Sequence, residues 1–155
     1  MTQVRLIRHG TAEARSARHA SDGARALTPY GASQAAALAA ALDDAAAAQI
    51  VAVIASPAVR CIETVTPLAE RLRQRVAVDH RLAEGSSAST VLALAAEHRG
   101  DVVLCSHGDV IGEVVLHLIS IGLVGPGEAG WATASTWILD VDNGVVQSAH
   151  YQDSN

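Results

Sequence analysis

The sequence has no lysine, and all 11 residues in its lysine-plus-arginine count are arginine. Asp and Glu together number 16, which gives a net charge of −5. A chain of this charge has no general attraction to nucleic acid or to an anionic membrane, so we expect neither as a partner. Two explanations fit the arginine preference, a genomic bias toward alanine and arginine codons or phosphate binding by planar guanidinium groups, and only the positions of the arginines can decide.

Cysteine is also scarce, with only Cys61 and Cys105. Two cysteines are too few for a disulfide framework, and no charged segment followed by an apolar one precedes the first strand-like run. Glycine, Asp, Ser or His interrupts each apolar stretch well before the ~18 residues of a membrane span. We therefore expect a soluble protein of a reducing compartment, the cytoplasm.

What the chain does have is enough apolar sequence for a core. Its 155 residues are 50% hydrophobic and 17% charged, which is typical of globular and not of disordered proteins. A chain of this length buries roughly 70% of its unfolded surface on folding. We expect residues 1–155 to form a single domain.

Short apolar runs alternate with helical patterns along the chain. Runs too short for helices predict strands at residues 4–7, 50–55, 76–78, 102–105, 136–141 and 145–149. Apolar residues at i, i+3, i+4 and i+7 or in longer runs predict helices around residues 35–42, 62–72, 91–96 and 110–121. Alternation of strands and helices indicates a largely parallel sheet with helices on its faces.

Local signals refine this prediction. Residues 142–144, Asp-Asn-Gly, separate the last two strands, and Asn-Gly supplies the positive φ values of a tight hairpin. Ser56 and Pro57 are predicted to start a helix, and Pro67 is expected to kink or break that helix near Thr66. The predicted fold is α/β, a three-layer α/β/α sandwich with a mostly parallel central sheet and an antiparallel C-terminal edge hairpin.

Polar residues follow three of the predicted strands where each strand ends. These residues are Arg8-His9-Gly10, Ser56-Pro57 with Arg60, and Ser106-His107-Gly108. In an open parallel sheet such carboxyl ends share one crevice. Guanidinium groups bind the equatorial oxygens of a transferring phosphoryl group, and a neutral imidazole is a competent nucleophile. The sequence therefore predicts a phosphate site made of two histidines and two arginines.

These motifs resemble those of the histidine phosphatase superfamily, whose signature is Arg-His-Gly after the first strand and a second histidine after a later strand. The resemblance covers nearly the whole chain and includes Leu27-Thr28-Pro29-Tyr30-Gly31 and Ser56-Pro57-x-x-Arg60-Cys61-x-x-Thr64. It implies a phosphoglycerate-mutase-like fold and a phosphatase that uses no metal and no cofactor.

The resemblance also implies roles for individual residues. His9 matches the nucleophile that becomes phosphohistidine. Arg8, Arg60 and His107 match the residues that hold the phosphate, and His107 would stabilise the transition state. Glu84 lies where the family's proton donor to the leaving group is expected.

The chain is most similar to the short branch of the superfamily. Between Glu84 and His107 there is room for one helix and no substrate-selecting cap, as in phosphohistidine phosphatases of the SixA type and in the phosphatase domain attached to some Nudix hydrolases. Arg25 falls where short members carry another pocket arginine, which implies a contact with phosphate or substrate. An open pocket would suit a phosphoryl group carried by a protein.

Several substrate classes stay open. The expected partner is a protein carrying phosphohistidine or a small phosphorylated metabolite, with nucleotide-derived or sugar phosphates as alternatives. A module that binds phosphate or phosphoproteins without turnover is the alternative from another class of function.

Two rival chemistries find little support in the sequence. A metal site is not indicated, because the chain has no His-x-x-x-His pair, no Cys-x-x-Cys and no carboxylate cluster at ligand spacing. A thiol phosphatase needs an arginine six residues after its cysteine, but Pro67 follows Cys61 at that distance and Ile111 follows Cys105. Both thiols are expected to be packing residues.

Two further pairs of residues each have two interpretations. Trp131 and Trp137 could line a ligand pocket or pack beneath a neighbouring helix. Asp109 and Glu113, one helical turn apart after His107, could orient its imidazole or form a solvated helix face.

Overall fold

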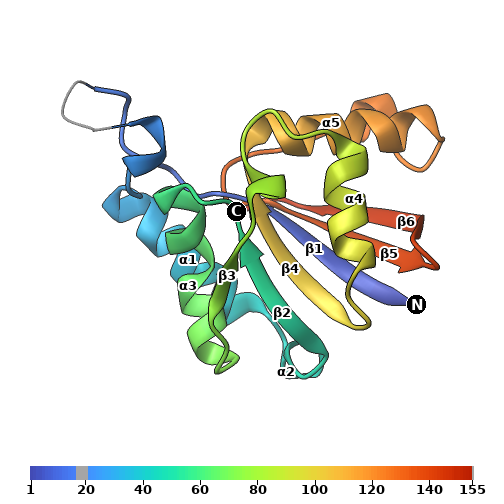
Figure 1. The fold of residues 1–155 in the computed structure, drawn as a ribbon, viewed down its shortest axis with the longest axis horizontal. Coiled ribbons are helices and arrows are strands. Elements are labelled where there is room, and N and C mark those ends of the chain that lie inside the picture. Colours follow the sequence, from blue (N-terminus) through green and yellow to red (C-terminus); the bar gives the residue numbers. More distant parts are fainter. Residues whose placement is uncertain (17–20, 155) are drawn as a thin grey trace.

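The computed structural model describes residues 1–16 and 21–154, whose strands form one mixed sheet between two layers of helices (Figure 1). The strands are β1 (Thr2–Arg8), β2 (Ile50–Ala55), β3 (Val76–Val78), β4 (Asp101–Ser106), β5 (Thr136–Asp142) and β6 (Val145–Gln152). Their order is β3-β2-β4-β1-β5-β6, with parallel pairing from β3 to β1 and antiparallel pairing of β5 with both β1 and β6. The predicted fold class is confirmed.

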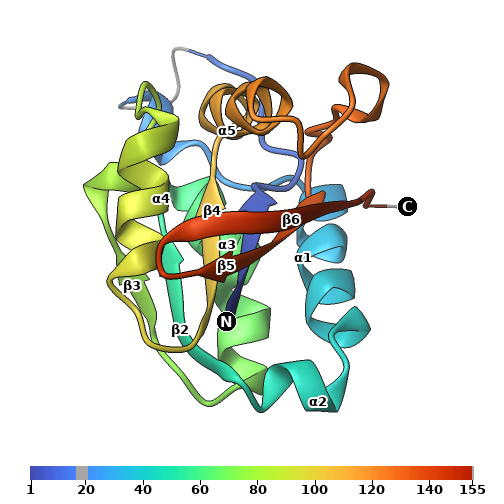
Figure 2. The ribbon, with the colours of Figure 1, turned by 90° about the vertical axis from the view of Figure 1, so that its right-hand side faces the viewer.

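Helices cover both faces of the sheet, as Figures 1 and 2 show. One face carries α1 (Pro29–Ala41), α2 (Asp44–Ala47) and α3 (Val59–Arg71), and the other carries α4 (Ala88–Ala96) and α5 (Gly108–Ser120). The described residues also form the short 3-10 helices η1 (Asp22–Ala24), η2 (His80–Leu82) and η3 (Pro126–Glu128). A separate cluster of buried apolar side chains fills each space between sheet and helices, which is why the central strands are apolar on both faces.

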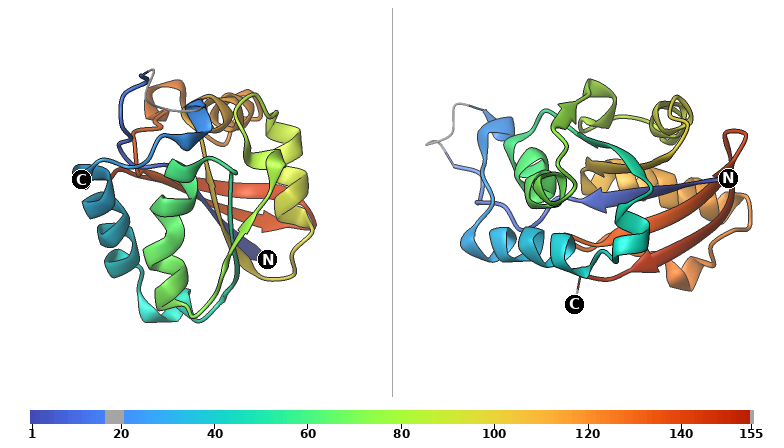
Figure 3. Two further views of the ribbon diagram at one scale, coloured as in Figure 1. Left: turned by 60° about the vertical axis from the view of Figure 1, so that its left-hand side comes forward. Right: turned by 90° about the horizontal axis from the view of Figure 1, so that it is seen from below.

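The hairpin of β5 and β6 has the predicted turn. Asn143 and Gly144 have φ values of 49° and 78°, which are the positive values that Asn-Gly favours. The start of β1 and the end of β6 lie at opposite ends of the sheet (Figure 3). Among the described residues, no helix is long and apolar enough to cross a membrane.

The break predicted near Thr66 is wrong, because α3 continues through Pro67 to Arg71. Buried residues on both sides of the proline, Val65 and Leu68, pack into the core beneath the helix. The alternative of a kink at this position stays a prediction. The Thr66 hydroxyl donates to the Ile62 carbonyl at 2.7 Å, which adds a bond next to the one that proline cannot make. Tertiary packing therefore outweighs the local signal of Pro67.

The predicted start of this helix is two residues too early. The helix begins at Val59, with Ala58 as its N-cap residue. The Ser56 hydroxyl accepts from the Ala58 amide at 3.3 Å and contacts Nε2 of His107 at 2.8 Å. Ser56 thus forms a turn that faces a histidine and is not the cap of α3.

Candidate active site

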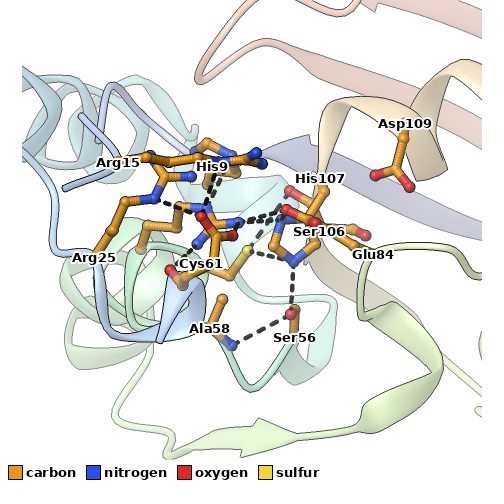
Figure 4. A network of polar contacts seen from close by, with 12 residues as sticks. His9, Arg15, Arg25, Ser56, Ala58, Cys61, Glu84, Ser106, His107 and Asp109 are labelled. Carbon is orange, nitrogen blue, oxygen red and sulfur yellow. Dashed lines mark hydrogen bonds and ion pairs between the residues drawn. The ribbon is translucent and has the colours of Figure 1, made fainter. Parts of the chain in front are cut away.

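The two predicted histidines meet at the carboxyl edge of the sheet (Figure 4). His9 directly follows β1, and His107 is the N-cap residue of α5 directly after β4. Their ring centroids are 5.5 Å apart, with an angle of 67° between the rings. Arg60, in the first turn of α3, bridges them with Nε 3.3 Å from His9 Nε2 and Nη2 3.2 Å from His107 Nδ1. The structure therefore gathers the three residues from three distant parts of the chain.

Arg8, the last residue of β1, lines the same cavity as the two histidines. Its Nη1 donates to the Trp131 carbonyl at 2.7 Å, whereas its buried Nε has no hydrogen-bond partner among the described residues. A Cβ on Gly108 would lie 2.9 Å from Cζ of Arg8, so glycine is needed for this close approach. A half-buried guanidinium with an unused donor beside two imidazoles is suited to an anionic ligand.

The His9 imidazole is held in one tautomer. Its Nδ1 lies 2.7 Å from the Gly10 carbonyl, which can only accept, so Nδ1 carries the proton. Nε2 then keeps a lone pair, which accepts from Arg60. Burial lowers the pKa of His9 to about 4; the Gly10 carbonyl opposes this shift, and the charges of Arg60, His107 and Arg8 add to it. The imidazole is therefore neutral near pH 7, and its Nε2 carries the lone pair that could attack phosphorus.

The turn after His9 is fixed by Thr64, which was not predicted to be a site residue. The Gly10 amide donates to Thr64 Oγ1 at 2.9 Å, and this hydroxyl donates to the Arg60 carbonyl at 2.6 Å. Thr64 therefore links the nucleophile turn to the helix that carries Arg60. The pattern Arg60-Cys61-x-x-Thr64 includes this threonine, but the sequence does not predict which backbone group its hydroxyl contacts.

The motif at residues 27–31 supports the same turn from the other side. Thr28 is the N-cap residue of α1, where its hydroxyl accepts from the Gly31 amide at 3.1 Å. A Cβ on Gly31 would lie 2.1 Å from the Thr11 carbonyl oxygen, so only glycine fits. The Gln34 side chain, one turn further, accepts from the Thr11 amide at 2.8 Å. The first turn of α1 is thus packed directly against the loop after His9.

His107 is almost fully buried, with 3% of its surface exposed. Its Nε2 contacts the Ser56 hydroxyl at 2.8 Å, and its Nδ1 lies 3.4 Å from Oε1 of Glu84. The sulfur of Cys61 is 3.7 Å from Nε2. The contacts on its ring nitrogens fix the plane of the imidazole, so that Nδ1 faces Arg60 and Glu84.

Arg60 is 1% exposed, and a buried cation must be paired. Its Nη2 lies 2.6 Å from Oε1 of Glu84 and 3.2 Å from Oδ2 of Asp22, and its Nη1 donates to the Asp22 carbonyl at 3.0 Å. Two carboxylates, both partly exposed, thus neutralise the guanidinium. Glu84 was expected here, whereas Asp22 was not.

The loop that carries Glu84 is tied to the end of β4 and the start of α5. The Ser106 hydroxyl donates to the Leu82 carbonyl at 2.6 Å, and the Gly85 amide donates to Oδ2 of Asp109 at 2.8 Å. Gly85 has a φ of 86°, which favours glycine. Asp109 therefore anchors the Glu84 loop, a role that neither interpretation of this residue had included.

Arg25 is held by Asp22 and not by the histidines. Its Nε lies 2.9 Å from Oδ1 of Asp22, and its Nη1 donates to the Glu13 carbonyl at 2.6 Å. Although partial burial alone would raise the pKa of Asp22, the hydrogen bond from Arg25 and the charges of Arg60, Arg25 and Arg15 lower it. Arg25 is thus linked to Arg60 through one shared carboxylate, and its predicted contact with phosphate stays a prediction.

The histidines open onto a cavity of about 630 Å³. Its lining residues are Arg8, His9, Arg15, Glu84, His107, Gly108, Asp109, Gly112, Glu113, Leu116 and Trp131. The two tryptophans differ, because Trp137 is 2% exposed and packs in the core whereas Trp131 is 40% exposed and borders this cavity. The described residues include no group of three or more His, Cys, Asp or Glu side chains that could hold a metal ion.

The sequence is similar to those of known proteins. The profile of the histidine phosphatase superfamily (branch 1) matches residues 4–90. The 8-oxo-(d)GTP phosphatase of Mycolicibacterium smegmatis is 32% identical over 154 residues, which cover 96% of this chain and 47% of that protein. The chain thus spans about half the length of this curated relative.

Solved structures are similar along most of the chain. A SixA-type protein from Agrobacterium tumefaciens has a TM-score of 0.72 at 23% identity and covers 90% of this chain and 91% of its own. A protein histidine phosphatase SixA in complex with tungstate has a TM-score of 0.69 at 21% identity, with coverages of 97% and 94%. Since the superfamily profile matches more than half of the sequence, the chain belongs to the histidine phosphatase superfamily.

Proposed function

We propose that this protein is a phosphatase that moves a phosphoryl group first to Nε2 of His9 and then to water. One observation carries the proposal. Arg60, a guanidinium with 1% exposure, lies within hydrogen-bond distance of His9, His107 and Glu84 at the same time. A phosphate that binds Arg60 is therefore placed beside a nucleophile, a second imidazole and a carboxyl group.

In the first step, the lone pair of His9 Nε2 forms a bond to phosphorus while the bond to the leaving group breaks. Arg8, Arg60 and His107 donate to the equatorial oxygens, where negative charge spreads in the transition state. The Glu84 carboxyl gives its proton to the departing atom. The gain for catalysis is that these donors are already ordered before substrate binds, because each is held by the contacts described above.

In the second step, the Glu84 carboxylate takes a proton from water, and the water oxygen attacks the phosphorus. The bond between phosphorus and His9 Nε2 breaks, which regenerates the neutral imidazole and releases inorganic phosphate. Both steps rely on cationic side chains for charge stabilisation, so the reaction is proposed to need no metal and no cofactor.

The proposed substrate is a protein phosphohistidine or a small phosphomonoester, in line with the SixA name of the similar structures. A second candidate is a phosphate derived from a nucleotide, favoured by the relative that is an 8-oxo-(d)GTP phosphatase. The free thiols of Cys61 and Cys105 support the expectation of a reducing compartment, the cytoplasm.

Hydrolysis of 4-nitrophenyl phosphate tests the proposal, with wild type compared with His9→Ala in excess chelator. We expect turnover by wild type, unchanged by the chelator, and none by the variant. Acid-quenched and alkali-quenched enzyme should differ, because a phosphohistidine is labile in acid and survives alkali.

Three results would contradict the proposal. Equal turnover by His9→Ala and wild type would show that His9 is not the nucleophile. Loss of activity in chelator, with recovery when zinc or magnesium is added, would indicate a metallohydrolase. Binding of phosphate without any turnover indicates the non-catalytic phosphate-binding module.

A further inference from the structure

One face of α5 continues the catalytic cavity away from the histidines. Asp109, Gly112, Glu113 and Leu116 follow one another at i, i+3, i+4 and i+7, so they share one side of the helix. All four line the cavity of about 630 Å³ that His9 and His107 open onto. The cavity therefore extends along two turns of α5, on the order of 10 Å at ~1.5 Å per residue.

Two apolar side chains in the wall of this extension are exposed. Leu116 is 57% exposed and Trp131 is 40% exposed, although both border the same cavity as His9 and His107. Gly112 lines the same cavity and leaves a hollow, since a Cβ built there would have no heavy atom within 4 Å apart from the neighbouring backbone of its own helix. An indole, a leucine and a glycine backbone together form a surface that suits a flat ring.

Trp131 is presented by a fixed loop. Its own carbonyl accepts from Arg8 at 2.7 Å, and the Gly130 carbonyl accepts from Nε1 of Trp137 at 2.7 Å. The Ala132 amide donates to the Tyr151 hydroxyl at 3.2 Å. Because three consecutive residues are bonded to the body of the protein, the exposed indole is not explained by a loose loop.

The Glu113 side chain lies beside this surface. In the part of the chain that the structure describes, the Glu113 carboxylate makes neither a hydrogen bond nor an ion pair. A carboxylate only accepts hydrogen bonds, and its two oxygens match two adjacent N–H donors. The phosphate end of the cavity is cationic and the far end has an acceptor, so the two ends suit different parts of one ligand.

We propose that Gly112, Glu113, Leu116 and Trp131 form a leaving-group subsite for the base of a nucleoside phosphate. The base stacks on Trp131, and Glu113 accepts from a ring N–H and an adjacent amino group, as in a guanine-type base. Adenine offers a donor next to an acceptor and fits Glu113 less well.

This inference rests on the proposed phosphatase function and names its substrate class. Its test compares kcat/KM for guanosine 5′-monophosphate, adenosine 5′-monophosphate, acetyl phosphate and phosphoramidate. Acetyl phosphate has no ring, and phosphoramidate has the phosphorus–nitrogen bond of phosphohistidine. We expect wild type to prefer the guanosine compound to all three others.

Two variants test whether the preference for guanosine 5′-monophosphate depends on this subsite. Gly112→Leu fills the hollow, and Trp131→Ala removes the stacking surface while keeping the carbonyl that binds Arg8. Each should lower kcat/KM for guanosine 5′-monophosphate about 10-fold more than for acetyl phosphate, mainly through KM. Glu113→Gln should reduce the preference for guanine over adenine. Glu70→Gln, on the exposed side of α3, is the control and should leave all ratios unchanged.

The outcomes separate this inference from the proposed function. Turnover of acetyl phosphate or phosphoramidate without preference for a nucleotide overturns the subsite and leaves the phosphatase intact. Equal losses on all substrates in Gly112→Leu and Trp131→Ala also overturn it. Absence of turnover with every substrate contradicts the proposed function itself.

Discussion

The Asp22 carboxylate and the Arg60 guanidinium form an ion pair, with Oδ2 3.2 Å from Nη2. Both residues line a cavity of about 600 Å³ together with Glu84 and His107. An anion that binds Arg60 therefore competes with a carboxylate that belongs to the protein. Asp22 also pairs with Arg15 and Arg25, so the same carboxylate gathers three arginines at the site.

Replacement of Asp22 by asparagine should strengthen phosphate binding. The change removes the competing charge and keeps the size of the side chain. We expect the inhibition constant of inorganic phosphate to fall about 2- to 5-fold, the range of a partly exposed ion pair. Asp44→Asn removes an exposed ion pair with Arg71 and serves as the control. Unchanged or weaker inhibition in Asp22→Asn would show that the carboxylate does not compete.

Arg60→Ala should lower kcat by roughly 100- to 1000-fold, because it removes a preordered donor from the transition state. Arg60→Lys keeps the charge but loses the planar fork, so it should recover only a small part of the rate. Steady-state kinetics with 4-nitrophenyl phosphate measures both. Thermal melts of the variants separate lost catalysis from lost folding, and near-normal turnover of a folded Arg60→Ala protein would remove Arg60 from the mechanism.

Lowering the pH should destabilise the protein through His9. Its pKa is about 4 in the folded protein, below its usual 6.5, so between these values the unfolded chain binds a proton that the folded protein does not. His9 therefore contributes a loss of stability as pH falls from about 6.5 to about 4. Urea unfolding at several pH values should show wild type losing more stability over this range than His9→Gln.

The same shift can be observed directly by nuclear magnetic resonance. Titration of the His9 ring should show a neutral imidazole with the proton on Nδ1 down to about pH 4. A midpoint near 6.5 would contradict both the burial of the ring and its readiness for attack at mildly acidic pH.

Thr64→Val should reduce activity although Thr64 is not expected to touch substrate. Loss of the hydroxyl leaves the Gly10 amide without its acceptor, which costs about 1–3 kcal/mol of stability and frees the His9 turn. Thr64→Ser keeps the hydroxyl and should restore most of the stability and activity. A positioning role predicts lower kcat with a changed His9 titration midpoint, whereas a purely structural role would move only the melting temperature.

The sequence predicted the sheet well because its central strands are buried on both faces and stand out as apolar runs. The bounds of β2 and β3 agree with the prediction, and the other strands differ by a few residues. The error at Pro67 has a tertiary cause, since the packing of α3 against the sheet is not visible in local propensity.

The site was predictable to the extent that strand ends converge. Arg8, His9, Arg60, His107 and Glu84 lie together for this reason, whereas Asp22, Thr64 and Gln34 were missed. Their contribution depends on which side chain meets which backbone group across the fold. Single residues such as Trp131 and Trp137 had equal status in the sequence, and only the positions of neighbouring elements make one a core residue and the other a cavity wall.

The contact between Gly31 and the Thr11 carbonyl has a consequence for engineering. Because no side chain fits at position 31, the first turn of α1 lies directly against the loop after His9. Transplanting the nucleophile loop into another scaffold would thus require the opening turn of α1 as well. Substitutions at residues 28–34 should therefore alter catalysis, even though none of those residues borders the 630 Å³ cavity.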